Sequence, residues 1–163
     1  MSSQNEAHTS QIAATLASLT LNDAQRLTGE QIPYLGFIIS KATQAIVARS
    51  DAALEPFGIT SRHYGILYVI SHEAGLPQKA IGDRLRIDRT TMVKLVDDLE
   101  KMGLVVREKD PNDRRAYMLS LSPLAKEKLA DIDQHVLAAE AESIASLQPE
   151  EVQQLLAILL KLL

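Results

Sequence analysis

The chain has 163 residues, of which 46% are hydrophobic, 4% aromatic and 23% charged, with 7 glycines and 6 prolines. This balance is typical of one ordinary globular domain and excludes collagen-like, low-complexity and wholly disordered chains. The 17 basic and 21 acidic residues give a formal net charge of −4, which excludes a uniformly basic coat for nucleic acid. Because the chain has no cysteine, disulfides, thiolate metal sites and cysteine nucleophiles are excluded too.

The sequence carries no sign of export or membrane insertion. The first 30 residues are polar and lack the basic and apolar regions of a secretion signal. The longest apolar run, Leu155 to Leu160, falls far short of the ~20 residues needed to span a bilayer. We therefore expect a cytoplasmic protein that makes no use of a membrane.

The charge is unevenly distributed along the chain. Residues 76–116 hold 10 of the 17 basic residues and 8 acidic ones, whereas residues 117–163 hold 3 basic and 7 acidic ones. A solvated helical surface with mixed charges would explain the middle block as well as a binding site would. The block therefore needs an architectural reason before it is interpreted as a contact surface for a polyanion.

Apolar periodicity and capping residues predict helices throughout the first hundred residues. Residues 1–9 show no periodicity and are expected to form a loose tail, followed by a short helix capped by Ser10. The further helices are expected from Pro33 to Pro56, from Thr60 or Ser61 to Gly75, from Pro77 to Arg86, and from Arg89 to Met102 after an Asp88 cap.

After Gly103 the period changes from helix to strand. Residues 104–108 and 116–121 are short runs with β-branched or aromatic members, and the intervening segment contains the turn former Asp-Pro-Asn-Asp. These runs predict a β-hairpin, which is followed by helices from Pro123 to about Ser146 and from Pro149 onward. The fold class is mainly α with a small β-hairpin wing.

The last helix predicts an assembly. It carries leucine or isoleucine at most positions from Leu155 to Leu163, and a helix that is apolar on all sides must be buried on all sides. One small chain offers little interior for this, although packing within the chain stays an alternative. We expect a homodimer in which this helix, the 123–146 helix and the N-terminal helices interleave.

Two short helices joined by a tight turn and followed by a hairpin with a basic tip describe a winged helix-turn-helix. In the second helix an inward stripe of Met92, Leu95, Val96 and Leu99 leaves Thr90, Lys94 and Lys101 on the opposite face. Taken singly, these polar residues could be ordinary exposed surface. Taken together with the hairpin, they indicate that the following residues contact double-stranded DNA: Arg89, Thr90, Thr91, Lys94, Arg107, Lys109, Arg114 and Arg115.

The run Asp88 to Val105, and then Asp-Pro-Asn-Asp-Arg-Arg-Ala over residues 110–116, resembles the MarR family of transcription regulators. The resemblance implies a homodimer whose winged lobes straddle a pseudo-palindromic operator. It also implies repression of nearby genes and release from DNA by a small, phenolic or anionic aromatic ligand. Two departures are Pro77, which cannot supply a side-chain cap, and Arg86, which stands where glycine often ends a helix.

The resemblance also divides the chain and suggests an effector site. Residues 1–31 would be a tail and short helix, residues 32–59 and 123–163 a dimerisation region, and residues 60–122 the DNA-binding lobe. The effector pocket would be lined by Tyr34, Phe37, Ile38, His63, Tyr64 and Tyr68. Core packing of the aromatic residues, and a role for His63 at a helix start, are the alternatives.

The sequence contains no assembled catalytic site, because it lacks a phosphate-binding glycine loop, a nucleophile elbow and a zinc-protease motif. His63 and His72 lie on opposite sides of one expected helix, so they cannot form a metal pair. We expect no enzyme activity, no cofactor and no metal. The alternative function is a helical dimer that uses a degenerate winged helix to bind a protein or to sequester a ligand.

Overall fold

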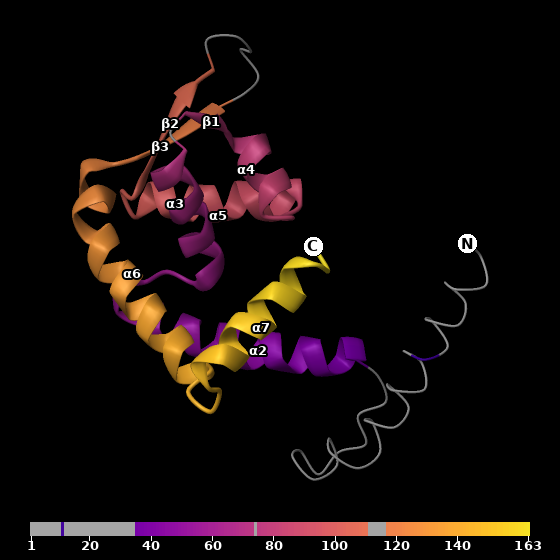
Figure 1. Ribbon diagram of the computed structural model, residues 1–163. Helices are drawn as coiled ribbons and strands as arrows, with labels where there is room; N and C mark the ends of the chain where they lie inside the picture. The colour runs from indigo at the N-terminus through magenta and orange to yellow at the C-terminus, as the bar shows by residue number, and fades with distance from the viewer. Residues whose placement is uncertain (1–10, 12–34, 74, 111–116) are drawn as a thin grey trace, which may run out of the picture. The chain divides into compact units, whose positions relative to one another are not determined.

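Figure 1 shows the computed structural model, which describes residues 11, 35–73, 75–110 and 117–163. The chain divides into two compact units, Met1–Ile46 and Val47–Leu163. Within the described ranges, no helix is both long enough and apolar enough to cross a membrane. The expected tail, the short helix after Ser10 and the start of the next helix at Pro33 lie outside the described residues.

The two helices that precede the charged block lie where periodicity predicts them. Helix α2 spans Leu35–Leu54 and passes into a 3-10 turn at Glu55–Phe57. Gly58 ends this turn with a φ of 69°, and its N–H donates to the carbonyl of Glu55 at 2.9 Å. Helix α3 spans Ser61–His72 and begins after Thr60. The helix boundaries predicted from Pro56, Gly58 and Thr60 are therefore confirmed.

The helix-turn-helix is formed by α4, Gln78–Arg84, and α5, Arg89–Lys101. Pro77 gives α4 no side-chain cap, as its lack of a polar side chain predicts. Arg86, in the turn between the helices, has a φ of 52° and is the one non-glycine residue with positive φ in the described ranges. The turn thus forces an ordinary residue into the left-handed region that glycine adopts more easily.

The sheet has three antiparallel strands, one more than the predicted hairpin. Strands β2, Val105–Lys109, and β3, Tyr117–Leu121, form the predicted pair, with Val105 opposite Leu121 and Lys109 opposite Tyr117. Strand β1, Leu76–Pro77, pairs with the other edge of β3. The sequence prediction missed β1 because two residues ending in proline give no alternating pattern. Residues 111–116 at the predicted hairpin tip lie outside the described residues.

The core of the Val47–Leu163 unit lies where α3, α4 and α5 pack against the sheet (Figure 1). The predicted inward stripe of α5 is confirmed, since Met92, Val96 and Leu99 are buried and Leu95 is half-buried. Burying a side chain of this size stabilises the fold by about 1.5–3 kcal/mol. This packing fixes which face of α5 points outward.

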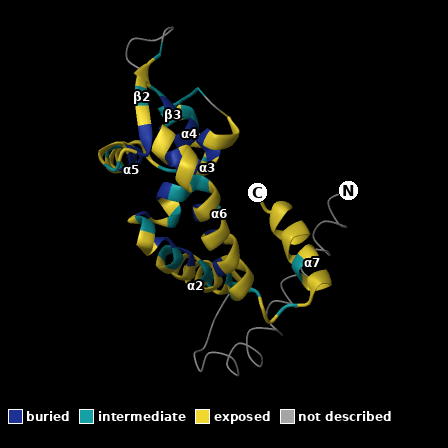
Figure 2. Cartoon of the chain, turned by 90° about the vertical axis from the view of Figure 1, so that its left-hand side faces the viewer, coloured by how far each residue is buried: buried dark blue, intermediate teal, exposed yellow. Residues whose placement is uncertain are grey.

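The last two helices differ sharply in burial. Helix α6, Pro123–Ser143, ends three residues before the expected Ser146 and buries Ile132 and Val136. Helix α7, Pro149–Leu160, has no buried residue, and Figure 2 shows it almost entirely in the colour of exposed residues. Its apolar surface includes Leu156 and Ile158, each 56% exposed, so the rest of the Val47–Leu163 unit, in its described residues, leaves this helix uncovered.

Candidate nucleic-acid interface

Helix α5 begins with a strong local cap. One carboxylate oxygen of Asp88 accepts hydrogen bonds from the backbone N–H groups of Thr90 and Thr91, both at 3.0 Å. The other oxygen accepts from the Thr91 hydroxyl at 2.6 Å. Hydrogen bonds from the Thr91 side chain and backbone hold the pKa of Asp88 below its usual value. The cap therefore fixes the first turn of α5 and already satisfies two of its free N–H groups.

The outward face of α5 carries the side chains that the sequence analysis assigned to DNA. Thr90 and Lys94 are exposed opposite the buried stripe of the helix, and Arg89 is exposed in the first turn, on the flank next to Met92. Thr91 is half-buried and its hydroxyl proton is directed to Asp88, which leaves its methyl group and a lone pair for other contacts. A helix with short polar and long cationic residues on its first turns suits the major groove of DNA.

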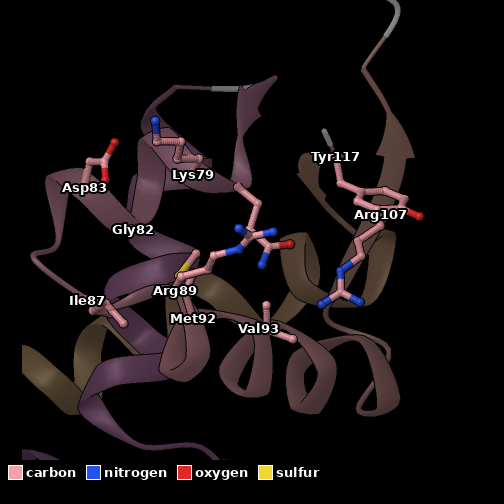
Figure 3. A pocket seen from close by; sticks show the side chains of 10 residues that line it. Lys79, Gly82, Asp83, Ile87, Arg89, Met92, Val93, Arg107 and Tyr117 are labelled. Carbon is pink, nitrogen blue, oxygen red and sulfur yellow. The ribbon is translucent and has the colours of Figure 1, made fainter. Parts of the chain in front are cut away.

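A groove of about 570 Å³ lies beside α5, between α4 and the strands (Figure 3). Arg89 reaches into it from the start of α5, and Arg107 extends from β2 toward α5 beside Tyr117 (Figure 3). Lys79 lies on the α4 wall. Sequence reasoning missed Lys79, although its position just after the Pro77 helix start was a usable signal. Lys79 and Arg89 bring positive charge to this concave surface, which Asp83 also lines, while the charge of Arg107 is paired with carboxylates of α5.

The wing residues differ in what the structure shows of them. Lys109 is exposed at the end of β2. Arg114 and Arg115 lie outside the described residues, so their role stays a prediction. Arg107 is 19% exposed and its guanidinium binds Asp97 at 2.5 Å and Glu100 at 3.2 Å. The expectation that Arg107 contacts DNA from the hairpin did not include its pairing with these two carboxylates of α5, and the DNA contact itself stays a prediction.

Those predicted effector residues that the structure describes lie on α2 and α3. Tyr34 is outside the described residues, and Phe37 and Ile38 belong to the Met1–Ile46 unit. On α3, Tyr68 is 47% exposed and stacks on His72 with ring centroids 4.2 Å apart. The exposed ring of Tyr68 is available for a further aromatic contact.

Tyr64 and His63 are occupied by structural contacts. The hydroxyl of Tyr64 donates to Asp133 of α6 at 2.9 Å. Burial raises the pKa of Tyr64, and this hydrogen bond raises it further. The Nδ1 atom of His63 accepts from the N–H of Thr60 at 3.1 Å, as the helix-start alternative expects. Burial lowers the pKa of His63, against the opposing effect of Asp98 and Asp51. Its Nε2 atom is buried without a partner in the described part of the chain.

No group of three histidine or acidic side chains in the described ranges is arranged to hold a metal ion. The interface offers hydrogen-bonding groups and cations on α5, along the groove and on β2. A helix-turn-helix that packs against a small sheet and carries cations on its exposed side defines a winged-helix DNA-binding protein.

Comparisons with known proteins agree with this class. A family profile described as "MarR family" matches residues 57–116. A protein of Thauera aromatica, described as a transcriptional regulatory protein for the hcr operon, is 34% identical over 85% of this chain and 84% of its own length.

Solved structures also match. A MarR-family regulator from Rhodococcus sp. RHA1 has a TM-score of 0.71 at 29% identity, covering 76% of this chain and 88% of its own. CouR from Rhodococcus jostii RHA1, solved bound to p-coumaroyl-CoA, has a TM-score of 0.68 at 26% identity, covering 76% and 87%. The chain belongs to the MarR family of transcriptional regulators, and the family predicted from the 88–116 motifs is confirmed.

Proposed function

We propose that this chain is a homodimeric repressor of nearby genes that binds a pseudo-palindromic operator and is released by a small ligand. The observation that carries the proposal is the outer face of α5, where Thr90 and Lys94 are exposed opposite the buried stripe and Arg89 is exposed in the first turn. We assign this face to the major groove. Since its partner would be chromosomal DNA, the protein would act in the cytoplasm.

The contacts divide into two kinds. Thr90 and Lys94 would read base edges, while Arg89 at the start of α5 would reach a base or a phosphate. Lys109, Arg114 and Arg115 of the wing would enter the neighbouring minor groove, where guanidinium groups respond to the negative potential of narrow A·T-rich stretches. Thr91 would contribute its methyl group.

A dimer accounts for the uncovered helix α7. Its exposed apolar residues include Leu156, Ile158 and Leu160, the last of them 69% exposed. Removing apolar surface from water is favourable by about 25 cal/mol for each Å². A second copy of this helix would therefore stabilise it by covering its apolar residues. A dimer would also present two winged lobes to the two halves of an operator.

The ligand would be phenolic or anionic and aromatic. CouR was solved with an aromatic thioester, and here the exposed Tyr68 offers a stacking surface on α3. The expected lining also includes Tyr34, Phe37, Ile38, His63 and Tyr64. Release from DNA requires that the ligand bind more tightly to a spacing of the lobes that does not fit the operator.

The test is a mobility-shift titration of the purified protein with the DNA upstream of its own gene, over a salt series. The proposal expects tight binding that weakens with salt and weakens strongly in an Arg114→Ala/Arg115→Ala variant. A Lys126→Ala/Lys128→Ala variant removes the same charge from α6 and should bind as the wild type does. Absence of binding to any DNA would overturn the proposal and favour the protein-binding or ligand-sequestering dimer.

A further inference from the structure

We propose that Arg107 is a positioning residue that clamps the wing to the recognition helix and pairs with two acidic groups whose charge would otherwise repel DNA more strongly. The inference rests on the proposed DNA binding of α5 and gives Arg107 a role different from that of the other wing cations. It concerns a cluster of three side chains, Asp97, Glu100 and Arg107, which we call the wing clamp.

The strand pattern places Arg107 on the helix-facing side of the wing. Side chains alternate along a strand, so Arg107 shares a face with Val105 and not with Val106 or Glu108. Val105 is 2% exposed, whereas Val106 is 40% exposed. Arg107 therefore continues the buried face of β2 toward the tip, and its side chain crosses to α5 beside Tyr117 (Figure 3).

In the wing clamp, both terminal nitrogens of the Arg107 guanidinium are paired with carboxylates. One terminal nitrogen binds Asp97 at 2.5 Å and the other binds Glu100 at 3.2 Å. The Nε atom is buried and has no partner among the described residues. An arginine held in this way presents little of its donor surface to solvent, and its planar fork bridges two carboxylates in a way that lysine cannot reproduce.

The charge balance explains why the clamp matters for a polyanion. Asp97 and Glu100 lie on the helix assigned to the major groove and contribute two negative charges, of which Arg107 cancels one. Isolated surface ion pairs contribute little, but here one partly buried cation joins two partners from a different element. Loss of Arg107 would both free β2 from α5 and leave two unpaired carboxylates beside the phosphates.

The clamp predicts a specific pattern among charge variants. Arg107→Gln should weaken binding to the upstream DNA about tenfold, with no reduction in the dependence of affinity on salt. Adding Asp97→Asn and Glu100→Gln should recover about threefold of the lost affinity, because no unpaired carboxylate remains although β2 is still untied from α5. A matched variant that adds Asp98→Asn and Glu108→Gln to Arg107→Gln removes the same charge from neighbouring positions and should not restore binding.

A direct phosphate contact makes the opposite prediction. In that case Arg107→Gln would lower the salt slope by about 0.9, and the Asp97→Asn/Glu100→Gln addition would leave the binding weak. Either of these results would overturn the clamp.

A second readout needs no DNA. Amide hydrogen exchange over Val105–Lys109 of the full chain should become several-fold faster in Arg107→Gln than in the wild type, because the wing loses its tie to α5. Unchanged exchange would overturn the clamp. If the wild type bound no DNA, the proposed function would fail while this readout would still decide whether Arg107 holds the wing.

Discussion

The hydroxyl of Tyr64 on α3 donates to the carboxylate of Asp133 on α6 at 2.9 Å, across 69 positions of sequence. The bond joins a helix of the expected DNA-binding lobe to a helix of the expected dimerisation region. It therefore ties α3 to α6 within the Val47–Leu163 unit.

Removing this bond should cost stability. Tyr64→Phe keeps the ring and deletes the donor, so we expect the free energy of unfolding to fall by about 1 kcal/mol in urea titration. Because the folded pKa of Tyr64 is raised, the unfolded tyrosine releases its proton first as pH rises. The contribution of Tyr64 should therefore be complete below pH ~10 and be lost progressively as the pH rises above that value. Tyr68→Phe, at an exposed ring on the same helix, is the control and should leave stability unchanged.

His63 predicts a loss of stability in mild acid. Its folded pKa is lowered, chiefly by burial, so the unfolded state binds the proton more readily. Its contribution is complete above the unfolded pKa of about 6.5 and is lost as the pH falls below that value. In His63→Gln the amide oxygen can still accept from Thr60 without titrating. The difference in unfolding free energy between wild type and variant should change with pH below 6.5, and a constant difference would refute this account.

Arg86 predicts opposite effects on stability and binding. Arg86→Gly relieves the positive φ and should raise the free energy of unfolding by up to about 1 kcal/mol. If Arg86 also touches a phosphate, the same change should weaken DNA binding and lower the salt slope by about 0.9. Arg86→Ala is the matched control, because it removes the charge and keeps the strain. Unaltered affinity and slope in both variants would exclude the phosphate contact.

The exposed apolar surface of α7 predicts that the protein forms a dimer through this helix. Leu156→Glu/Ile158→Glu places charges on its uncovered apolar surface and should convert the dimer into monomers in sedimentation equilibrium. Val93→Glu introduces the same kind of charge at a 41% exposed position of α5 and should leave the dimer intact. A dimer that persists in the α7 variant would place the interface elsewhere.

Sequence reasoning predicted the elements that local rules determine. The period of 3.6 residues located the buried stripe of α5, and the Asp88 cap and Gly103 fixed its ends. It missed β1, whose two residues are held only by pairing with β3. Such a strand depends on a tertiary contact that no local pattern contains.

At the interface, too, sequence reasoning predicted the features set by local rules and missed those set by tertiary contacts. The exposed positions of Thr90, Lys94 and Lys101 followed from the helical period alone, and Arg89 was assigned from its place in the first turn. The partners of Arg107 did not, because sequence reasoning treated the wing cations as a group. Val105 and Arg107 lie two positions apart on β2 and therefore share its buried face. This signal could have separated Arg107 from the other cations of the wing. The bond between Tyr64 and Asp133 joins residues too distant in sequence for any spacing rule.

The central claim is that the outer face of α5 and the wing read a DNA sequence. The most direct measurement is competition between the upstream DNA of the gene and a shuffled duplex of the same length and composition, at fixed salt. The account predicts that the wild type prefers the upstream DNA by about 1,000-fold or more, and that Thr90→Ala loses discrimination at one operator position. Equal affinity for both duplexes at every salt concentration would contradict it.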